Sequence, residues 1–252
     1  MTTTPSPKNL LSLQGVHTHI GAYHILHGVD LAVPEGQLTM LLGRNGAGKT
    51  TTLRTIMGLW PASQGQVVFD GQPIHGRATP DIAQLGIAYV PESMGIFADL
   101  TVAENLLLAA RQAKGLKDLD SQRLEWLFSL FPALKKFWLY PAGKLSGGQK
   151  QMLAIARAMI EPRRLLLIDE PSKGLAPAII RNLIEALSEL KKGAQQTTIL
   201  LVEQNFMVAR ALGDQVAVMD DGRVVHAGPM RELAEDEALQ QRLLGLSLAA
   251  HQ

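Results

Sequence analysis

One short motif restricts the fold of this chain more than any other feature of its sequence. It follows the apolar run 38–42 and consists of Gly43, Arg44, Asn45, Gly46, Ala47, Gly48, Lys49 and Thr50. Glycines at these spacings let the backbone curl so that successive N–H groups face one point, and a helix that begins there adds the positive end of its dipole. The motif therefore predicts a buried strand, a phosphate-binding loop and a helix over about 48–58, which form one unit of an α/β fold.

The side chains of this loop suit a nucleotide. Lys49 is expected to reach the β- and γ-phosphates, the Thr50 hydroxyl to bind Mg²⁺, and Thr51 to add a phosphate contact. The alternative is a glycine-rich turn with a chance lysine, which the complete match between a predicted strand and a predicted helix disfavours. The motif alone predicts nucleotide binding and leaves the reaction open.

Apolar runs alternate with helical patterns along most of the chain. Strands are predicted over 10–20, 25–33, 67–71, 87–90, 165–168, 198–202, 216–219 and 223–226. Helices are expected over 177–191 and from 229 onward. Strands that alternate with helices are typical of an α/β core with a mainly parallel sheet.

The middle of the chain follows a different pattern. From about 93 to 159 the apolar residues have helical spacing, and amphipathic helices are predicted over 103–113 and 122–130. A helical stretch within an α/β chain indicates an inserted subdomain.

Two carboxylates stand where the apolar run 165–168 ends. Because ligands of open α/β sheets bind outside the carboxyl ends of the strands, Asp169 and Glu170 are expected near the bound phosphates. Asp169 suits Mg²⁺, and Glu170 suits the polarisation of an attacking water, which makes it the candidate catalytic base. A solvated acidic turn is the alternative.

Composition excludes several classes of protein. The chain has 24 basic and 23 acidic residues and a formal net charge of +1, so no basic surface typical of nucleic-acid binding is expected. Cysteine is absent, which excludes disulfides and thiolate metal sites. No apolar run reaches the roughly 18 residues of a membrane span, so any role at a membrane is expected to depend on partners.

A second glycine-containing motif precedes the acidic strand. It comprises Ser146, Gly147, Gly148 and Gln149, which follow Leu145. Ser146 and Gln149 have the spacing of a helix capping box. A cap does not need two glycines, however, and these leave bare N–H groups at a helix N-terminus for an anion. The motif therefore predicts that each of two facing chains caps the nucleotide of the other.

The order of phosphate loop, Leu-Ser-Gly-Gly-Gln signature and acidic strand resembles that of ABC ATPases, over essentially the whole chain. More narrowly, four segments are similar to those of the ATPase subunits of branched-chain amino acid importers, namely 50–58, 89–92, 169–177 and 201–205. Such importers use two paralogous ATPases, and the segment 201–205 resembles that of the smaller one.

This resemblance implies a single ABC ATPase domain over 1–252. Its parts would be a nucleotide-binding core over 9–92 and 160–228 with an N-terminal antiparallel β subdomain, a helical subdomain over about 93–159, and a helical tail over 229–252.

It also implies ligands and partners. ATP and Mg²⁺ would be bound, with Glu92 joining Thr50 and Asp169 at the metal. The partners would be an identical or paralogous ATPase, transmembrane permease subunits and, indirectly, a periplasmic or extracellular substrate-binding protein, but no nucleic acid. The chain would lie peripherally at the cytoplasmic face of the membrane.

The sequence departs from the usual ABC pattern at several positions. Glu92 replaces a glutamine, Ala176 replaces an aspartate, and Gln204 replaces the histidine that contacts the γ-phosphate, so that Gln204 becomes the second candidate catalytic residue. Ile20 stands where an aromatic residue normally stacks on adenine, and Tyr23 is the nearest aromatic residue.

Other functions remain as alternatives. A soluble ABC ATPase acting on nucleic acid or ribosomes usually has two cassettes, a coiled coil or a basic linker, and a small-molecule kinase has no use for the signature. Urea or short amides are alternative substrates, since a motor subunit does not touch the transported molecule.

Overall fold

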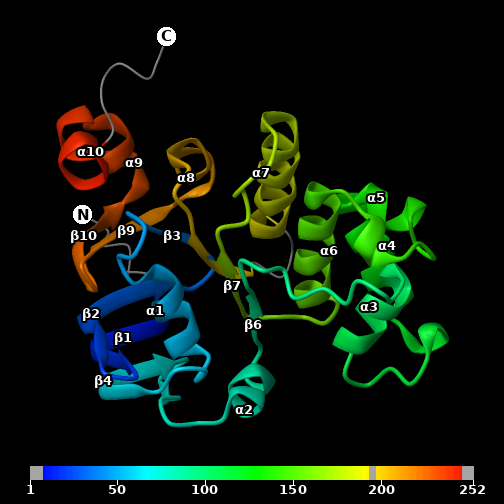
Figure 1. Cartoon of the computed structure of the whole chain (residues 1–252), viewed down its shortest axis with the longest axis horizontal. Coiled ribbons are helices and arrows are strands. Elements are labelled where there is room, and N and C mark those ends of the chain that lie inside the picture. Colours follow the sequence, from blue (N-terminus) through cyan, green and yellow to red (C-terminus); the bar gives the residue numbers. More distant parts are fainter. Residues whose placement is uncertain (1–7, 193–196, 246–252) are drawn as a thin grey trace, which may run out of the picture.

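Two sheets form the framework of the structure, a computed structural model that describes residues 8–192 and 197–245 (Figure 1). The strands are β1 (Asn9–Ile20), β2 (Tyr23–Pro34), β3 (Leu38–Gly43), β4 (Ala62–Phe69), β5 (Gln72–Pro73), β6 (Ile87–Val90), β7 (Leu165–Asp169), β8 (Thr198–Val202), β9 (Gln215–Asp220) and β10 (Arg223–Pro229). The helices are α1 (Lys49–Ile56), α2 (Thr79–Gln84), α3 (Val102–Ala109), α4 (Ser121–Leu130), α5 (Pro132–Lys136), α6 (Gly147–Met159), α7 (Pro177–Lys192), α8 (Phe206–Leu212), α9 (Met230–Glu235) and α10 (Glu237–Leu244), with short 3₁₀ turns at Leu116–Asp118 and Ala142–Lys144.

The larger sheet has the strand order β10-β9-β3-β8-β7-β6, and all its neighbouring strands pair in parallel except β10, which forms an antiparallel hairpin with β9. The smaller sheet has the order β2-β1-β4-β5 and is antiparallel. The predicted α/β class, with a mainly parallel sheet and an antiparallel N-terminal sheet, is confirmed.

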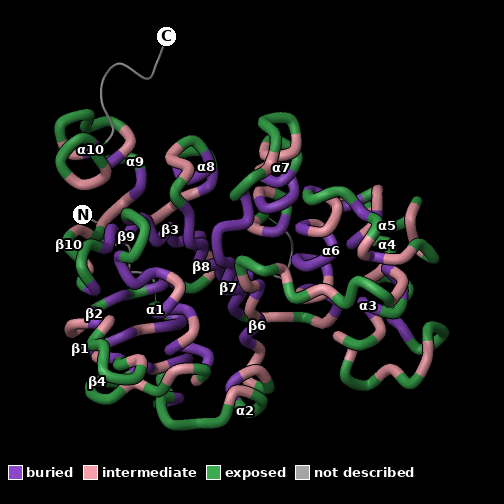
Figure 2. The backbone as a smooth tube through the Cα atoms, viewed as in Figure 1, coloured by how far each residue is buried: buried purple, intermediate pink, exposed green. Residues whose placement is uncertain are grey.

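The parallel sheet separates two hydrophobic cores. Side chains of β3 alternate between them: Met40 and Leu42 face the core made with α3, α4, α6, α7, α8 and α9, while Leu41 faces the core made with the antiparallel sheet, α1 and α2. All residues of β3, β7 and β8 are buried, as the purple centre of Figure 2 shows. This explains why these strands read as unbroken apolar runs in the sequence.

Helices α3, α4, α5 and α6 lie together beyond the edge strand β6, whereas α9 and α10 lie at the opposite end of the sheet (Figure 1). The division of the chain into core, helical subdomain and tail stays a prediction, and its residues 1–7, 193–196 and 246–252 lie outside the described ones. Within the described ranges, no helix has both the length and the apolar character that a membrane crossing requires.

Two predicted boundaries were wrong. The helix predicted over 103–113 ends at Ala109, because Ala110 adopts extended backbone and the N–H of Arg111 donates to the Glu161 carboxylate at 2.6 Å. The strand predicted over 67–71 begins at Ala62 and ends at Phe69. Its first half is exposed and polar, so it carries no hydrophobic signal.

Candidate functional site

The phosphate loop joins the end of β3 to the start of α1 in a tightly enclosed turn. Gly43 has φ +149°, and a Cβ there would lie 2.3 Å from the carbonyl oxygen of Met219 on the neighbouring strand β9. Only glycine fits this approach of two backbones. The Lys49 ammonium donates to the carbonyl oxygens of Gly43 at 2.9 Å and Arg44 at 3.0 Å, so the lysine spans the loop from inside.

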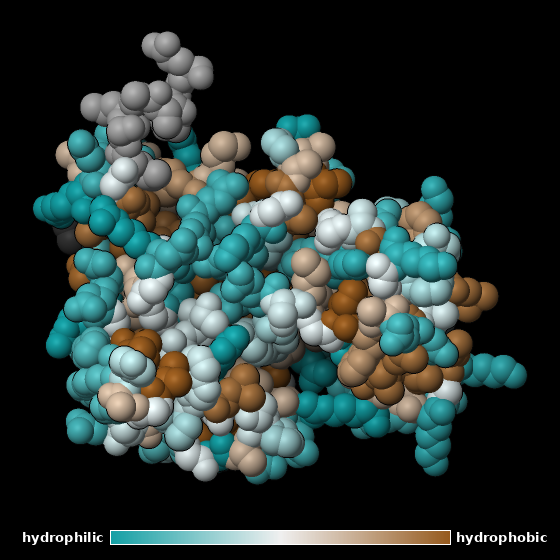
Figure 3. All heavy atoms as spheres, viewed as in Figure 1, coloured by the Kyte–Doolittle hydropathy of each residue, from teal (hydrophilic) through white to brown (hydrophobic). Residues whose placement is uncertain are grey.

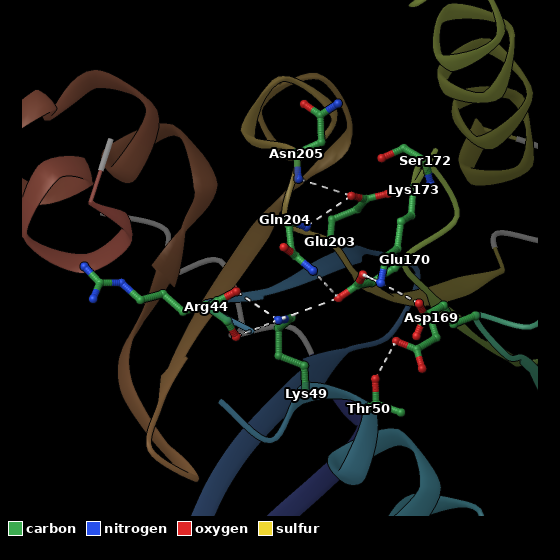
Figure 4. Close-up of polar contacts among 12 residues, drawn as sticks. Arg44, Lys49, Thr50, Asp169, Glu170, Ser172, Lys173, Glu203, Gln204 and Asn205 are labelled. Carbon is green, nitrogen blue, oxygen red and sulfur yellow. Dashed lines mark hydrogen bonds and ion pairs between the residues drawn. The ribbon is translucent and has the colours of Figure 1, made fainter. Parts of the chain in front are cut away.

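The carboxyl end of β7 brings the predicted acidic residues Asp169 and Glu170 to this loop (Figure 4). The Thr50 hydroxyl donates to Oδ1 of Asp169 at 3.1 Å, and Nζ of Lys49 lies 3.8 Å from Oε1 of Glu170. The side chains of Lys49 and Glu170 are only 4% and 9% exposed, so this ion pair is shielded from water. Thr50 and Asp169, which are 119 positions apart in sequence, thus share one small polar site at the sheet edge.

Gln204 belongs to the same cluster. Its Nε2 donates to Oε1 of Glu170 at 2.7 Å, which is a short, charge-assisted contact. Glu170 itself has φ +47°, a left-handed conformation that a residue with a side chain rarely adopts. Such strain persists only where neighbouring contacts hold it, and it is concentrated at functional sites.

Burial sets the protonation behaviour of this cluster. It lowers the pKa of Lys49, against the opposing charges of Glu170 and Asp169. It also raises the pKa of Asp169, to which the charges of Glu170 and Glu92 add, while the hydrogen bond from Thr50 acts in the opposite direction. A cation and several carboxylates are therefore held close together in poorly solvated surroundings.

Glu92 follows β6 and lies at the margin of this cluster. Its Oε1 is 2.6 Å from Nζ of Lys173, which also lies 3.5 Å from Oε2 of Glu170. Both Lys173 and Glu92 are exposed, at 57% and 44%. Lys173 thus connects the acidic groups of two strand ends.

The remaining loop residues make no side-chain contact with this cluster that the structure records among the described residues. The Arg44 side chain extends away from the cluster toward α10 (Figure 4), Asn45 and Gly46 are exposed, Ala47 and Gly48 are buried, and Thr51 is buried within α1. Near the end of the β1–β2 hairpin, Ile20 is partly buried, whereas Tyr23 is 75% exposed.

The signature residues form the N-terminus of α6 and make the predicted capping box. Ser146 Oγ accepts from the N–H of Gln149 at 3.3 Å, and Gln149 Oε1 accepts from the N–H of Ser146 at 2.9 Å. A Cβ at Gly148 would lie 2.4 Å from Cγ2 of Ile179, so this glycine is required for packing against α7. A Cβ at Gly147 would meet only Leu175, at 3.9 Å, so packing does not explain that glycine.

The signature and the phosphate loop are not brought together within one chain. Among the described residues, no hydrogen bond or ion pair joins 146–149 to 43–51. In Figure 1 the N-terminus of α6 and helix α1 lie on different sides of β7.

Three residues of the cluster are absent from the sequence prediction. Tyr89 donates from its hydroxyl to Oδ2 of Asp169 at 3.3 Å, and burial together with that carboxylate raises the pKa of Tyr89 to about 12. Lys173 has the contacts described above. Glu203 accepts hydrogen bonds from backbone N–H groups of two loops. Only Glu203 carried a sequence signal, since it follows the apolar run of β8 as Asp169 ends that of β7.

Comparisons with known proteins show the family of this chain. A family model described as ABC transporter matches residues 26–173. The chain is 39% identical to the high-affinity branched-chain amino acid transport ATP-binding protein BraG of Pseudomonas aeruginosa, over 86% of this chain and 91% of that protein. It is 36% identical to the probable branched-chain amino acid transport ATP-binding protein LivF of Archaeoglobus fulgidus, over 88% and 93%. The ADP conformation of MJ1267, an ATP-binding cassette of an ABC transporter, superposes with a TM-score of 0.78 at 26% identity, over 95% of this chain and 100% of that one.

Proposed function

The chain belongs to the ABC transporter family, and from this membership we propose that it is the ATP-hydrolysing subunit that energises an importer of branched-chain amino acids. As an ABC ATPase it binds nucleotide and couples hydrolysis to transport. The observation that carries the finer proposal is the 39% identity with a branched-chain amino acid transport ATP-binding protein over most of both chains. The site geometry supports the hydrolytic part of it.

Three residues of the cluster, Lys49, Glu170 and Gln204, have proposed roles in ATP hydrolysis. Lys49 and the N–H groups of 43–51 bind the β- and γ-phosphates, and Glu170 polarises the attacking water. Gln204, which donates to Glu170 at 2.7 Å, keeps that carboxylate in position and contacts the γ-phosphate. Phosphoryl transfer needs little else than an oriented nucleophile and a stabilised phosphate charge.

The residues at the strand ends fit Mg²⁺. Thr50 Oγ1 and Asp169 Oδ1, which lie 3.1 Å apart, are the hard oxygen ligands that this ion prefers, and it normally completes its shell with waters and phosphate oxygens. When bound, the ion would neutralise charge on the phosphates. Glu92, whose Oε1 is 2.6 Å from Nζ of Lys173, is proposed to join Thr50 and Asp169 at the metal.

The environment of Gly147 supports the proposal that a second ATPase chain, identical or paralogous, faces this one. The lack of a side chain at this position is not needed for packing, Gly147 is exposed, and the capping box occupies only the N–H groups of Ser146 and Gln149. A helix N-terminus of this kind is a ready anion site. We propose that it receives the γ-phosphate of the ATP held by the partner.

Substitution of Gly147 by aspartate tests this arrangement. A carboxylate at the helix N-terminus would repel the partner's phosphates, so ATPase activity of the assembled complex is expected to fall at least about tenfold. ATP affinity of the isolated subunit should stay unchanged, as measured by nucleotide titration. Gly147→Ala, for which there is room, is the matched control for size without charge. Loss of ATP binding by the folded, isolated Gly147→Asp subunit would contradict a site in the partner.

The membrane-spanning part of the transporter is proposed to be separate permease subunits, to which this chain attaches peripherally at the cytoplasmic face. Exposed apolar side chains occur on the helical side of the structure, namely Phe97, Leu108, Leu116, Leu139 and Tyr140. Figure 3 shows brown side chains gathered around α3 and α4 on this side. Such patches are typical of surfaces that other proteins cover.

The decisive experiment for the substrate is transport by the complete complex. The chain is reconstituted with its permeases and substrate-binding protein in liposomes, and uptake of labelled leucine, isoleucine and valine is compared with that of urea and acetamide. ATP-dependent uptake of the branched-chain amino acids alone is expected. Uptake of urea or acetamide in their place would reject the substrate, and hydrolysis without any transport would reject the importer.

A further inference from the structure

A buried carboxylate between β8 and α8 has no task in the roles assigned above. Glu203 is 2% exposed, and backbone N–H groups donate hydrogen bonds to both of its carboxylate oxygens. Oε1 accepts from the N–H of Ser172 at 2.9 Å, and Oε2 accepts from the N–H groups of Gln204 at 3.1 Å and Asn205 at 3.2 Å. Within 8–192 and 197–245, no lysine, arginine or histidine lies within ion-pair distance of it.

These donors belong to two loops that are distant in the sequence. Ser172 lies in the loop after β7, two residues beyond Glu170, and Gln204 lies in the loop after β8. A single carboxylate therefore spans the backbones that carry the proposed base and its hydrogen-bond donor, as Figure 4 shows. Burying a carboxylate costs free energy unless its oxygens accept hydrogen bonds. The three backbone N–H groups therefore stabilise the buried carboxylate, and the carboxylate in turn fixes the position of these N–H groups.

The loop after β7 also carries the backbone strain of the site. Glu170 has φ +47°, and its N–H donates to the carbonyl oxygen of Val202 at 2.9 Å. The bond from Ser172 to Glu203 restrains the same loop on the other side of Glu170. The strained residue is thus flanked by two bonds to the segment 202–203, and Gln204 adds a third contact to its side chain.

We propose that Glu203 is a positioning residue for hydrolysis: its buried carboxylate locks the loops after β7 and β8 together and so aims Glu170 and Gln204. This inference rests on the proposed function of those two residues. Glu203 acts through the loops and not on the phosphates, because its carboxylate is occupied by the three backbone donors. Its removal should therefore affect turnover and leave ATP binding unaltered.

The test uses Glu203→Gln in the full chain. A glutamine keeps the size but offers a single acceptor oxygen, so its amide group must face the N–H groups of one loop without bonding to them. We expect the turnover number for ATP to fall about tenfold, equivalent to about 1.4 kcal/mol in the barrier. The dissociation constant for ATP should stay within about twofold of wild type. Glu189→Gln, at an exposed position on α7, is the matched control and should behave as wild type.

Two further variants separate the possible outcomes. In Glu203→Asp the charge is kept but the side chain is too short to reach both loops, so the same loss of turnover is expected. If Glu203→Gln does not fold, Glu203→Asp takes its place in the test. Combined with Glu170→Gln, the Glu203 substitution should cause less than its full tenfold loss, since one of the two residues it aims has already been removed.

Normal turnover of a folded Glu203→Gln and Glu203→Asp, with only the melting temperature lowered, would overturn the proposal, because Glu203 would then serve stability alone. Weakened ATP binding with normal turnover at saturation would also overturn it. Equal turnover of wild type and Glu170→Gln is a different failure: it would reject the proposed hydrolytic role of Glu170 itself.

Discussion

Replacing Glu170 by glutamine is expected to nearly abolish ATP hydrolysis while ATP binding continues. A positioned general base typically contributes about a hundredfold to ten-thousandfold to the rate, and the amide cannot polarise the attacking water in the same way. The phosphate loop and the Thr50–Asp169 pair are left in place. The expected signature is a long-lived ATP-bound dimer, visible by size-exclusion chromatography, together with very low phosphate release.

The geometry makes this variant a conservative one. The amide oxygen of glutamine can still accept from Nε2 of Gln204, and the size of the buried side chain is unchanged. Thermal unfolding should confirm a folded protein, with Glu189→Gln as the control for loss of one surface carboxylate. Phosphate release within about twofold of wild type would disprove the assignment of Glu170 as the base.

Substitution of Gln204 by alanine should have the second-largest effect. The loss of one aligned donor in a transition state typically costs about 2.7–4 kcal/mol, so turnover is expected to fall about a hundredfold. The Glu170 carboxylate would lose its 2.7 Å donor and keep Lys49, at 3.8 Å, as its nearest buried partner. Steady-state hydrolysis and ATP titration of the same sample separate this loss from weaker binding.

Gln204→His provides a sharper test of the same role. A neutral imidazole can donate and accept as the amide does, so much of the activity should return. Histidine titrates near its ordinary pKa of about 6.5, whereas glutamine does not titrate, so only the histidine variant should acquire a change in rate across that pH. Full activity of Gln204→Ala, or a rate that does not change with pH in an active Gln204→His, would show that Gln204 is a surface residue without a role in hydrolysis.

The sequence predicted the part of the site that depends on short motifs at strand ends. Asp169 and Glu170 could be placed beside Lys49 because the carboxyl ends of parallel strands meet at one edge of a sheet. The positions of the central parallel strands also followed from apolar runs, since strands buried on both faces leave an unbroken signal.

Contacts between distant loops could not be predicted in this way. The pairing of Lys173 with Glu92 joins residues 81 positions apart, and no periodicity reports it. The early end of α3 depends on the carboxylate of Glu161, which lies 50 residues beyond Arg111. Glu203 also stands at a strand end, but its role becomes visible only when its backbone donors are known.

The sharing of one sheet by both cores has a consequence for cooperativity. Because neighbouring residues of β3, β7 and β8 face opposite sides, each strand is a wall of both cores, and neither core can lose its packing while the other stays intact. The two faces therefore form a single cooperative unit of folding. A ligand that binds at the carboxyl ends of these strands is therefore expected to raise the stability of helices that do not contact it.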